Sequence, residues 1–291
     1  MTASAPSPAQ GRLLIVAAAV LWSTSGMFTR FLREPTALGL DEPRLDPWQI
    51  AAGRVFFAGL AMLPLLRRGD LSFSPLMAGT ALTFAAMNAL FIRAMALGPA
   101  ANAIWLQYTA PFWLYLASVW LLREPADRRG TLSLFIGLAG VAVILYGGRR
   151  DEQTEVVLLA LGSGVTYALV VLGLRLQRGA SPAWLTAVNH LVGALALVPM
   201  VWWKGLPTWP QLGWLALFGT LQMGLPYLLM ARGLKSVGPQ EAGTLTLLEP
   251  ILNPLWAYLV APEKEKPTAY ILVGGGCILA GLAYRYWPGR R

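Results

Sequence analysis

The sequence predicts an all-α membrane protein with ten transmembrane helices, arranged as two inverted five-helix repeats. Of its 291 residues, 56% are hydrophobic and only 13% are charged, whereas a soluble domain carries about 25% charged residues. The apolar residues fall into blocks of about 20 residues, the length of a membrane-spanning helix, and the two halves of the chain resemble each other. A soluble α-solenoid is the alternative, but its helices would alternate polar and apolar faces, which most of these blocks do not.

Each apolar block is expected to be a helix, because backbone polar groups in lipid need hydrogen-bond partners within their own segment. Short loops connect the blocks and leave no room for a soluble domain. Residues 1–10 are expected to form a disordered tail, residues 11–150 the first repeat and residues 151–291 the second. The expected spans are residues 11–32, 47–66, 76–97, 101–122 and 130–146, then 156–176, 182–203, 211–234, 242–260 and 267–284.

The net charge of +9 does not indicate a nucleic-acid partner, because arginines lie in pairs at block ends, where they would contact lipid headgroups. Cys277 is the only cysteine and lies in an apolar block, which excludes disulfides and a thiolate metal site. No metal, cofactor or catalytic group is expected. The paired arginines are Arg67 and Arg68, Arg128 and Arg129, Arg149 and Arg150, and Arg290 and Arg291.

The distribution of basic residues predicts that both termini are cytoplasmic. In that orientation 13 of the 23 lysines and arginines lie on the cytoplasmic side and 9 on the outer side, while Arg54 lies within a span. An excess of Lys and Arg is typical of cytoplasmic loops. The sequence therefore predicts a multi-pass protein of a bacterial inner membrane.

Three sets of residues reveal the internal repeat. Because each half has an odd number of spans, the second half must enter the membrane from the opposite side. Inverted repeats place a binding site near the midplane, where the halves meet, so this organisation predicts a secondary transporter for a small molecule. The aligned residues are Arg93 with Arg232, Pro111 with Pro250 and Glu124 with Glu263 at a shift of 139, Trp22 with Tyr167 and Arg30 with Arg175 at 145, and Pro47 with Pro182 at 135.

Over nearly its whole length the chain resembles the drug/metabolite transporter superfamily, EamA type. Within it, the chain is most similar to the bacterial aromatic amino acid exporters of the YddG type. It departs from its own repeat pattern by having Asn189 where the first half has Arg54. The motifs that carry the resemblance are Trp22-Ser23, Pro47 followed by Arg54, Pro111 with Leu122-Arg123-Glu124, Gly137 and Gly140, and then Glu249-Pro250 with Glu263 and Gly274-Gly275-Gly276.

The resemblance implies a basket of ten helices, with spans 1, 3, 4, 6, 8 and 9 around a cavity and the other four outside. It also implies gradient-driven export of aromatic or hydrophobic amino acids, or related small metabolites, by alternating access. The sequence agrees in having no GxxxxGK[ST] loop for nucleotide phosphates. Drugs, nucleosides or amines are the alternative substrates, and we expect a monomer or weak dimer.

Two rival classes of function find less support. An intramembrane enzyme would need an HExxH motif, paired aspartates or a Ser/His pair, and the single histidine, His190, is isolated. A channel would need a ring of like charges or a carbonyl filter, and no such motif occurs.

The fourth predicted span carries an aromatic stripe. Trp105, Tyr108 and Phe112 follow at i, i+3 and i+7, with Gln107 and Pro111 nearby. Trp and Tyr offer flat apolar faces with a hydrogen-bonding edge, suited to stacking on an aromatic substrate. Packing against lipid or neighbouring helices is the alternative.

The ninth predicted span carries Thr246, Glu249 and Asn253 at the same spacing, with Pro250 as a possible hinge. A carboxylate at membrane depth costs about 2.5–3.5 kcal/mol, so Glu249 should face protein or water. Protonation would relieve this cost, which is compatible with proton coupling or with recognition of an amine. A neutral glutamic acid that ties helices together is the equal alternative.

Polar and aromatic residues of the other lining spans complete the candidate substrate site. Hydrogen bonding between helices competes with substrate binding for each polar member, and Arg54 is interpreted as structural. The glycines Gly137, Gly140, Gly274 and Gly281 are expected to allow close helix packing. The remaining candidates are Trp22, Phe84, Asn88, Phe91, Ser163, Thr166, Tyr167, Gln222, Met223 and Tyr227, with Pro226 as a second hinge beside Pro111 and Pro250.

Overall fold

The structure is a computed structural model that describes residues 6–150 and 153–287, and this part of the chain contains helices and loops but no strand. The α-helices are α1 (Pro8–Trp22), α2 (Ser25–Phe31), α3 (Pro47–Met62), α4 (Pro75–Leu97), α5 (Ala100–Gln107), α6 (Ala110–Trp120), α7 (Arg128–Arg150), α8 (Thr154–Leu176), α9 (Pro182–Val201), α10 (Trp209–Leu217), α11 (Leu225–Gly233), α12 (Pro239–Leu245), α13 (Leu248–Val260) and α14 (Ala269–Tyr286). A π-helical turn, η3 (Phe218–Gly224), joins α10 to α11.

Eight helical segments of the described chain are long and apolar enough to cross a membrane. They correspond to eight of the predicted spans, so the prediction of a helical multi-pass membrane protein is confirmed. The fourth and ninth predicted spans are not in this set, and each consists of two short helices, α5 with α6 and α12 with α13.

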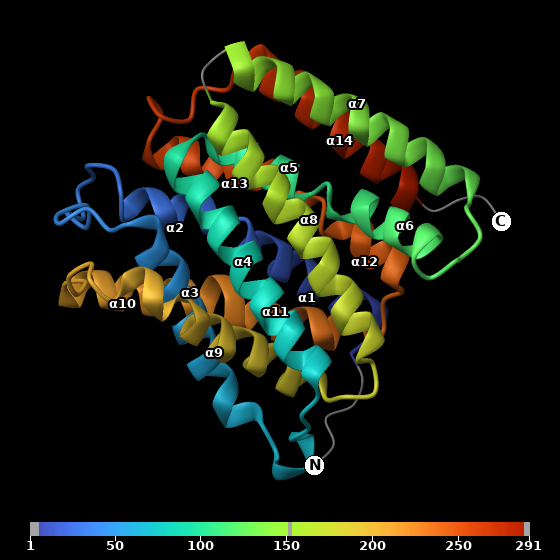
Figure 1. The fold of residues 1–291 in the computed structure, drawn as a ribbon, viewed down its shortest axis with the longest axis horizontal. Helices are drawn as coiled ribbons and strands as arrows, with labels where there is room; N and C mark the ends of the chain where they lie inside the picture. The colour runs from blue at the N-terminus through green and yellow to red at the C-terminus, as the bar shows by residue number, and fades with distance from the viewer. Residues whose placement is uncertain (1–5, 151–152, 288–291) are drawn as a thin grey trace.

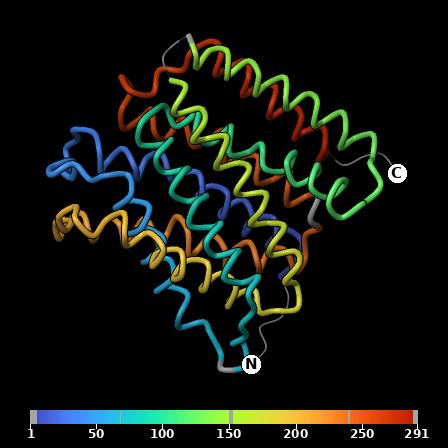
Figure 2. Tube along the Cα trace, viewed as in Figure 1, coloured from blue at the N-terminus to red at the C-terminus, as the bar shows by residue number. Residues whose placement is uncertain are grey.

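Helices from the two halves of the chain pack beside each other throughout the bundle. Figure 1 shows α7 alongside α14 and α4 alongside α8, and these pairs, with α3 and α9, are in extensive contact. The trace in Figure 2 makes the same point by colour, since green α7 runs beside red α14. Neither half therefore forms a separate domain, and a cavity between the halves would be lined by residues of both.

Both ends of the described chain lie at one end of the bundle, which we call the terminal end. Arg12 on α1 forms an ion pair with Glu241 on α12, with 2.6 Å between Nε and Oε1. Thr244 on α12 donates a hydrogen bond to the carbonyl of Tyr286, where α14 ends. We call the opposite end, where α2 leads into α3, the distal end.

Capping residues fix where several helices begin. Ser7 and Gln10 form a capping box at the start of α1, and Asp46 and Gln49 form another at α3, each satisfying backbone N–H groups that have no partner within the helix. Because α1 begins at Pro8, the disordered tail predicted for residues 1–10 is too long at its C-terminal end. Residues 1–5 of that tail lie outside the described residues.

Prolines explain the break in the ninth predicted span, between α12 and α13, and the contacts that its carbonyl groups make. Pro250 and Pro254 have no N–H, so the carbonyls of Thr246 and Pro250, four residues before them, lose their helical partners. The Pro250 carbonyl instead accepts from Trp105 Nε1 of α5 at 2.8 Å. The Thr246 carbonyl accepts from the N–H of Glu249 at 3.0 Å and lies 3.1 Å from the Tyr108 hydroxyl, directly after α5. The break thus connects the two halves of the chain.

The predicted close packing at glycines is seen between α7 and α14. A Cβ at Gly140 would meet the carbonyl of Gly274, a Cβ at Gly137 would overlap the Phe112 ring, and Gly281 lies against the carbonyl of Ser133. Gly275 lies against the Trp105 ring, which is only 8% exposed. Side chains at these positions would force helices apart.

We expect Gly275→Ala to lower the free energy of unfolding by about 1–3 kcal/mol, the usual cost of overpacking a filled interior. The added methyl would overlap the Trp105 indole, which its hydrogen bond to Pro250 holds in place. Gly276→Ala is the matched control, because no atom lies within 4 Å of a Cβ at that position. The midpoint of thermal unfolding in detergent, followed by tryptophan fluorescence, compares the two. Equal midpoints would contradict this account of the packing.

Candidate functional site

A cavity of about 470 Å³ lies between the two halves of the chain. Its size falls within the range of about 300–1,000 Å³ that is typical of small-molecule sites. It extends from mid-bundle residues such as Trp22 and Glu249 to Leu234 and Tyr286 near the terminal end. Aromatic rings and methionines form much of its wall: Trp22, Phe91, Tyr108, Tyr167, Tyr227 and Tyr286, with Met87, Met223 and Met230.

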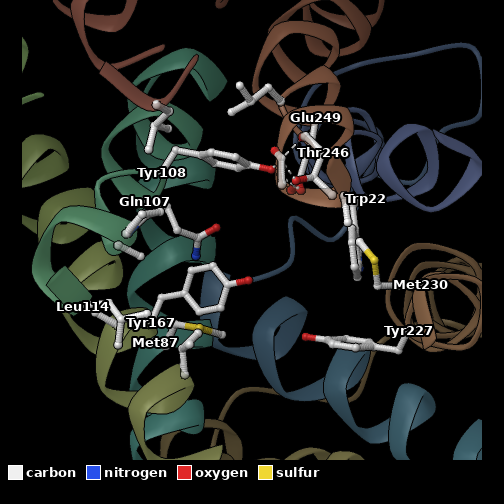
Figure 3. A pocket seen from close by; sticks show the side chains of 18 of the residues that line it. Trp22, Met87, Gln107, Tyr108, Leu114, Tyr167, Tyr227, Met230, Thr246 and Glu249 are labelled. Carbon is white, nitrogen blue, oxygen red and sulfur yellow. Dashed lines mark hydrogen bonds between the residues drawn. The ribbon is translucent and has the colours of Figure 1, made fainter. Parts of the chain in front are cut away.

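Several polar groups face this cavity without a hydrogen-bond partner in the described protein. Figure 3 shows the hydroxyls of Tyr167 and Tyr227 pointing into the same open space from opposite sides, with the Gln107 amide nearby. The Tyr227 ring is held by edge-on contact with Trp22, whose ring centroid is 5.4 Å away. Rigid rings that present unpaired hydroxyls to an apolar space are suited to binding a ligand that is partly apolar and partly polar.

Glu249 is the only carboxylate that lines the cavity among the described residues. Its Oε2 accepts a hydrogen bond of 2.7 Å from the Tyr108 hydroxyl, which Figure 3 shows as a dashed line. Glu249 lies in the first turn of α13, directly after the helix break, so the break directs its side chain into the cavity. The second carboxylate oxygen is left available to a ligand or proton.

Arg54, from α3, also lines the cavity. It is only 3% exposed, and no carboxylate of the described chain lies within ion-pair distance of it, that is, within 4.0 Å. Nε donates to Asn88 Oδ1 at 2.7 Å and Nη1 to Gln222 Oε1 at 3.5 Å. The guanidinium also lies 5.5 Å from the Phe91 ring and 5.3 Å from the Phe218 ring. The cavity therefore contains one cation and one anion that do not pair with each other.

The structure brings together most of the substrate-site residues predicted from the sequence. Ten of them line the cavity, and the proposed hinge Pro111 lies beside them. They are Trp22, Phe91, Gln107, Tyr108, Tyr167, Gln222, Met223, Tyr227, Thr246 and Glu249.

The aromatic stripe predicted for the fourth span is not formed. The interpretation assumed one continuous helix, but α5 ends at Gln107 and α6 begins at Ala110, so the i+3 and i+7 positions do not share a face. Tyr108 alone of the three lines the cavity. Trp105 is buried against α13 and α14, and Phe112 packs on Gly137.

The other predicted residues outside the cavity lining make contacts between or within helices. Asn253 donates to the Ser25 hydroxyl at 2.6 Å and joins α13 to α2. Asn88 is buried beneath Arg54 and also donates to the carbonyl of Ala51. The remaining ones are Phe84, which packs on His190, Ser163 and Thr166, which bond to carbonyls of their own helix, and the prolines Pro226 and Pro250, which are buried at helix breaks.

Sequence reasoning missed Arg54, Met87, Met230 and Tyr286 as lining residues. Arg54 was visible as a lone charge inside an apolar block, but its helix was expected to lie outside the basket. In the structure α3 and α14 both contribute side chains to the cavity, so the implied division into lining and outer spans is not followed. The methionines carry no motif, and only the packing of the helices identifies them.

The cavity continues toward the terminal end. A smaller cavity of about 220 Å³ shares Pro111, Leu114 and Tyr286 with it. This second space reaches Glu124 and Arg175, which form an exposed ion pair. The hydrogen bond from Arg175 lowers the pKa of the Glu124 carboxyl below its ordinary value, so this carboxyl is ionised at neutral pH.

The distal end is closed by a buried group of residues that we call the distal seal: Arg30, Glu34, Gly98, Ala100 and Glu265. The Arg30 and Glu265 side chains are 0% and 1% exposed, with 2.5 Å between Nε and Oε1. Arg30 Nη2 donates to the Gly98 carbonyl at 2.6 Å, and the Ala100 N–H donates to Glu265 Oε2 at 2.7 Å. Arg30 also lies 3.6 Å from Glu34. Three separate segments are thus joined at the distal end, and none of these five residues lines the cavity.

Comparison with known proteins shows that the chain is similar to transporters. The profile of the EamA-like transporter family matches the chain twice, over residues 9–146 and 154–286. An uncharacterized transporter of Archaeoglobus fulgidus is 30% identical over 94% of both chains. The uncharacterized transporter YwfM of Bacillus subtilis is 25% identical over 89% of this chain and 88% of its own. The threonine/homoserine exporter RhtA of Escherichia coli is 28% identical over 78% of this chain and 71% of its own.

A solved crystal structure superposes on this fold with a TM-score of 0.65, covering 96% of this chain and 98% of the other. Its sequence identity is 17%, so it supports the architecture alone.

Proposed function

The chain belongs to the EamA-like transporter family, and from this premise we propose that it exports aromatic or hydrophobic amino acids, or related small metabolites, by alternating access. The observation that carries the proposal is the cavity between the two halves. It combines an aromatic and methionine-rich wall with one carboxylate, Glu249, and one guanidinium, Arg54. Such a site can hold an apolar side chain and a charged backbone group at the same time.

The choice of amino acids rests on two further points. One relative is named as a threonine/homoserine exporter, and the cavity here offers charges of both signs, as an amino acid does. The rings and methionines favour larger apolar side chains than those of threonine or homoserine. The narrower resemblance to aromatic amino acid exporters stays a prediction. Drugs, nucleosides or amines are the alternative cargo, and they would not need both charges.

We propose that the ten predicted spans form two inverted repeats. The family profile matches each half separately, which supports the repeat. The helix breaks support it as well: α5 and α6 are separated at Tyr108 and Thr109, and α12 and α13 at Thr246 and Leu247. A shift of 139 residues carries the first break to within one residue of the second. The divided helices are the fourth span of each repeat and line the cavity from opposite sides.

The ion pairs at the two ends of the bundle are compatible with alternating access by two inverted repeats. Arg30 and Arg175 occupy equivalent positions in the first span of each repeat. Each pairs with a glutamate in the loop after the fourth span of the other half, Glu265 or Glu124. The distal pair is buried and the terminal pair is exposed, with side chains 48% and 39% accessible. We propose that these environments exchange when the cavity opens to the other side.

We propose that the terminal end faces the cytoplasm of a bacterial cell and the distal end faces outside, and the excess of basic residues expected on the side of the termini supports this orientation. The cavity in this structure then faces inward, as an exporter must be before it loads its cargo. Both chain termini are cytoplasmic in this arrangement.

Counterflow in proteoliposomes tests the proposal. Vesicles loaded with unlabelled tryptophan are expected to accumulate labelled tryptophan transiently and saturably, and phenylalanine and leucine should compete. Conductance without saturation would indicate a channel instead. Competition by nucleosides or amines alone, with no effect of any amino acid, would favour the alternative cargo.

A further inference from the structure

We infer that Arg54 binds the carboxylate of the transported solute while Glu249 binds its ammonium group, so that the cavity selects zwitterions. The inference deepens the proposed function and rests on it for the route of transport, but the role of Arg54 can be tested without it. Its starting point is that Arg54 is a buried cation in a membrane-spanning helix without a carboxylate partner among the described residues.

An unpaired charge at membrane depth is costly, and such residues mark substrate or ion pathways. Two other arginines are buried. Arg30 shows the usual solution, since it pairs with Glu265 inside the distal seal. Arg33, which follows α2 at the distal end, donates to the Leu45 carbonyl and does not line the cavity. Arg54 has only the uncharged oxygens of Asn88 and Gln222, and the contact with Gln222 is long at 3.5 Å. The protein therefore leaves the charge of Arg54 to be neutralised by something that enters the cavity.

The hydrogen-bond donors of Arg54 point to the same conclusion. A guanidinium has five N–H donors, and Asn88 and Gln222 occupy one on Nε and one on Nη1. Nη2 has no hydrogen-bond partner among the described residues, and it is not among the fully buried atoms that lack one. Because Arg54 lines the cavity, a ligand there can reach this nitrogen. Its N–H groups can donate charge-assisted hydrogen bonds to a carboxylate.

The surroundings hold this geometry in place. Asn88 donates its own amide to the Ala51 carbonyl at 2.9 Å, which turns its oxygen toward Arg54. Gln222 donates its amide to the Trp22 carbonyl at 2.9 Å, which turns the side-chain oxygen of Gln222 toward Arg54. The Phe91 and Phe218 rings flank the guanidinium. A cation that is fixed before its ligand arrives loses less conformational entropy on binding.

Glu249 supplies the complementary charge from the other half of the chain. It lies in α13 and Arg54 in α3, and both face the same cavity without forming an ion pair. An α-amino acid carries its carboxylate and its ammonium on the same carbon, so one zwitterion bound between Arg54 and Glu249 supplies a partner of opposite charge to each. An amine or a nucleoside would leave Arg54 buried without a counter-ion, so the pair discriminates against them.

Binding of matched ligands to the purified protein in lipid nanodiscs tests the inference. Labelled tryptophan is displaced by tryptamine, which lacks the carboxylate, and by indole-3-propionate, which lacks the ammonium. We expect tryptamine to bind the parent protein at least about 30-fold more weakly than tryptophan, the loss typical of an unpaired buried charge. In Arg54→Gln this preference should shrink to within about threefold.

Asn88→Asp separates ligand binding from a structural role. It places a carboxylate where Asn88 Oδ1 now lies, 2.7 Å from Arg54 Nε, and this fixed partner competes with the carboxylate of the solute. We expect tryptophan to bind at least about tenfold more weakly than to the parent protein. The variant also loses the hydrogen bond from Asn88 to the Ala51 carbonyl, so circular dichroism is used to check that it is folded. If Arg54 only stabilised the fold, Asn88→Asp would leave the preference for tryptophan over tryptamine unchanged, and that result would overturn the inference.

The two proposals can fail separately. If tryptophan is transported but tryptamine competes equally well, the inference is wrong and the proposed function stands. If no amino acid binds, the proposed cargo is wrong, and indole-3-acetate against indole-3-acetamide then tests Arg54 alone. Preference for the acid that Arg54→Gln removes supports the carboxylate site, and no preference or no binding of either overturns it.

Discussion

Glu265→Gln is expected to open the distal end of the transporter. The carboxylate now accepts from Arg30 with one oxygen and from the Ala100 N–H with the other. A glutamine has only one acceptor oxygen, so its NH₂ group must face either the guanidinium or the backbone N–H. Removing one partner of a buried ion pair costs about 3–5 kcal/mol. This cost applies only to the state in which the distal seal is closed, so the equilibrium shifts toward the opposite state.

Accessibility of a single cysteine measures the shift. Cys277 is the only cysteine, so Cys277→Ala gives a background in which Met223→Cys reports from the cavity wall. An impermeant thiol reagent applied to right-side-out vesicles should label the Glu265→Gln protein at least about tenfold faster than the parent, since about 1.4 kcal/mol already corresponds to a factor of ten.

Glu263→Gln is the matched control for this experiment. Glu263 lies in the same loop and pairs with Lys266, but its side chain is 86% exposed, and exposed pairs contribute little. Its labelling rate should equal that of the parent. If Glu265→Gln also labels at the parent rate while remaining folded, the distal seal does not control access.

The fold was predictable from the sequence because membrane-spanning helices carry their signal locally. Apolar length, proline positions and capping residues such as Ser7 and Asp46 each act within one segment. Pro111 is the sequence signal for the break at Tyr108 and Thr109. The predicted aromatic stripe requires a continuous helix, so it is not formed once the helix is divided there.

The site was only partly predictable, because the side chains that define it lie far apart in the sequence. Arg54 was interpreted as structural since its helix was expected on the outside of the bundle. Whether a buried arginine has a carboxylate partner depends on contacts such as Arg30 with Glu265, which are 235 residues apart. Those contacts follow from how the two halves pack, and no local pattern encodes them.

Glu249→Gln is expected to yield a folded protein with impaired transport that no longer responds to pH. The amide oxygen of glutamine can still accept the hydrogen bond that the Tyr108 hydroxyl now gives to Glu249, so the local structure is retained. The negative charge that would bind a substrate ammonium, or carry a proton, is lost. A buried charged partner is worth about 2–5 kcal/mol, which predicts at least about a 30-fold rise in the apparent KM for tryptophan.

Counterflow measured from about pH 5.5 to about 8.5 separates this role from that of a neutral helix contact, because only an ionisable group gives the rate a pH dependence of its own. The parent rate should change across this range, and the Glu249→Gln rate should be flat. Glu249→Asp is the matched control, since it keeps an ionisable group at the same position and should restore a pH-dependent profile at a lower rate. Indole-3-propionate has no ammonium group, so its binding should be weakened far less than that of tryptophan. Superimposable profiles and equal KM values in parent and Glu249→Gln would leave Glu249 as a hydrogen-bond partner of Tyr108 and nothing more, because a glutamine fills that role at every pH.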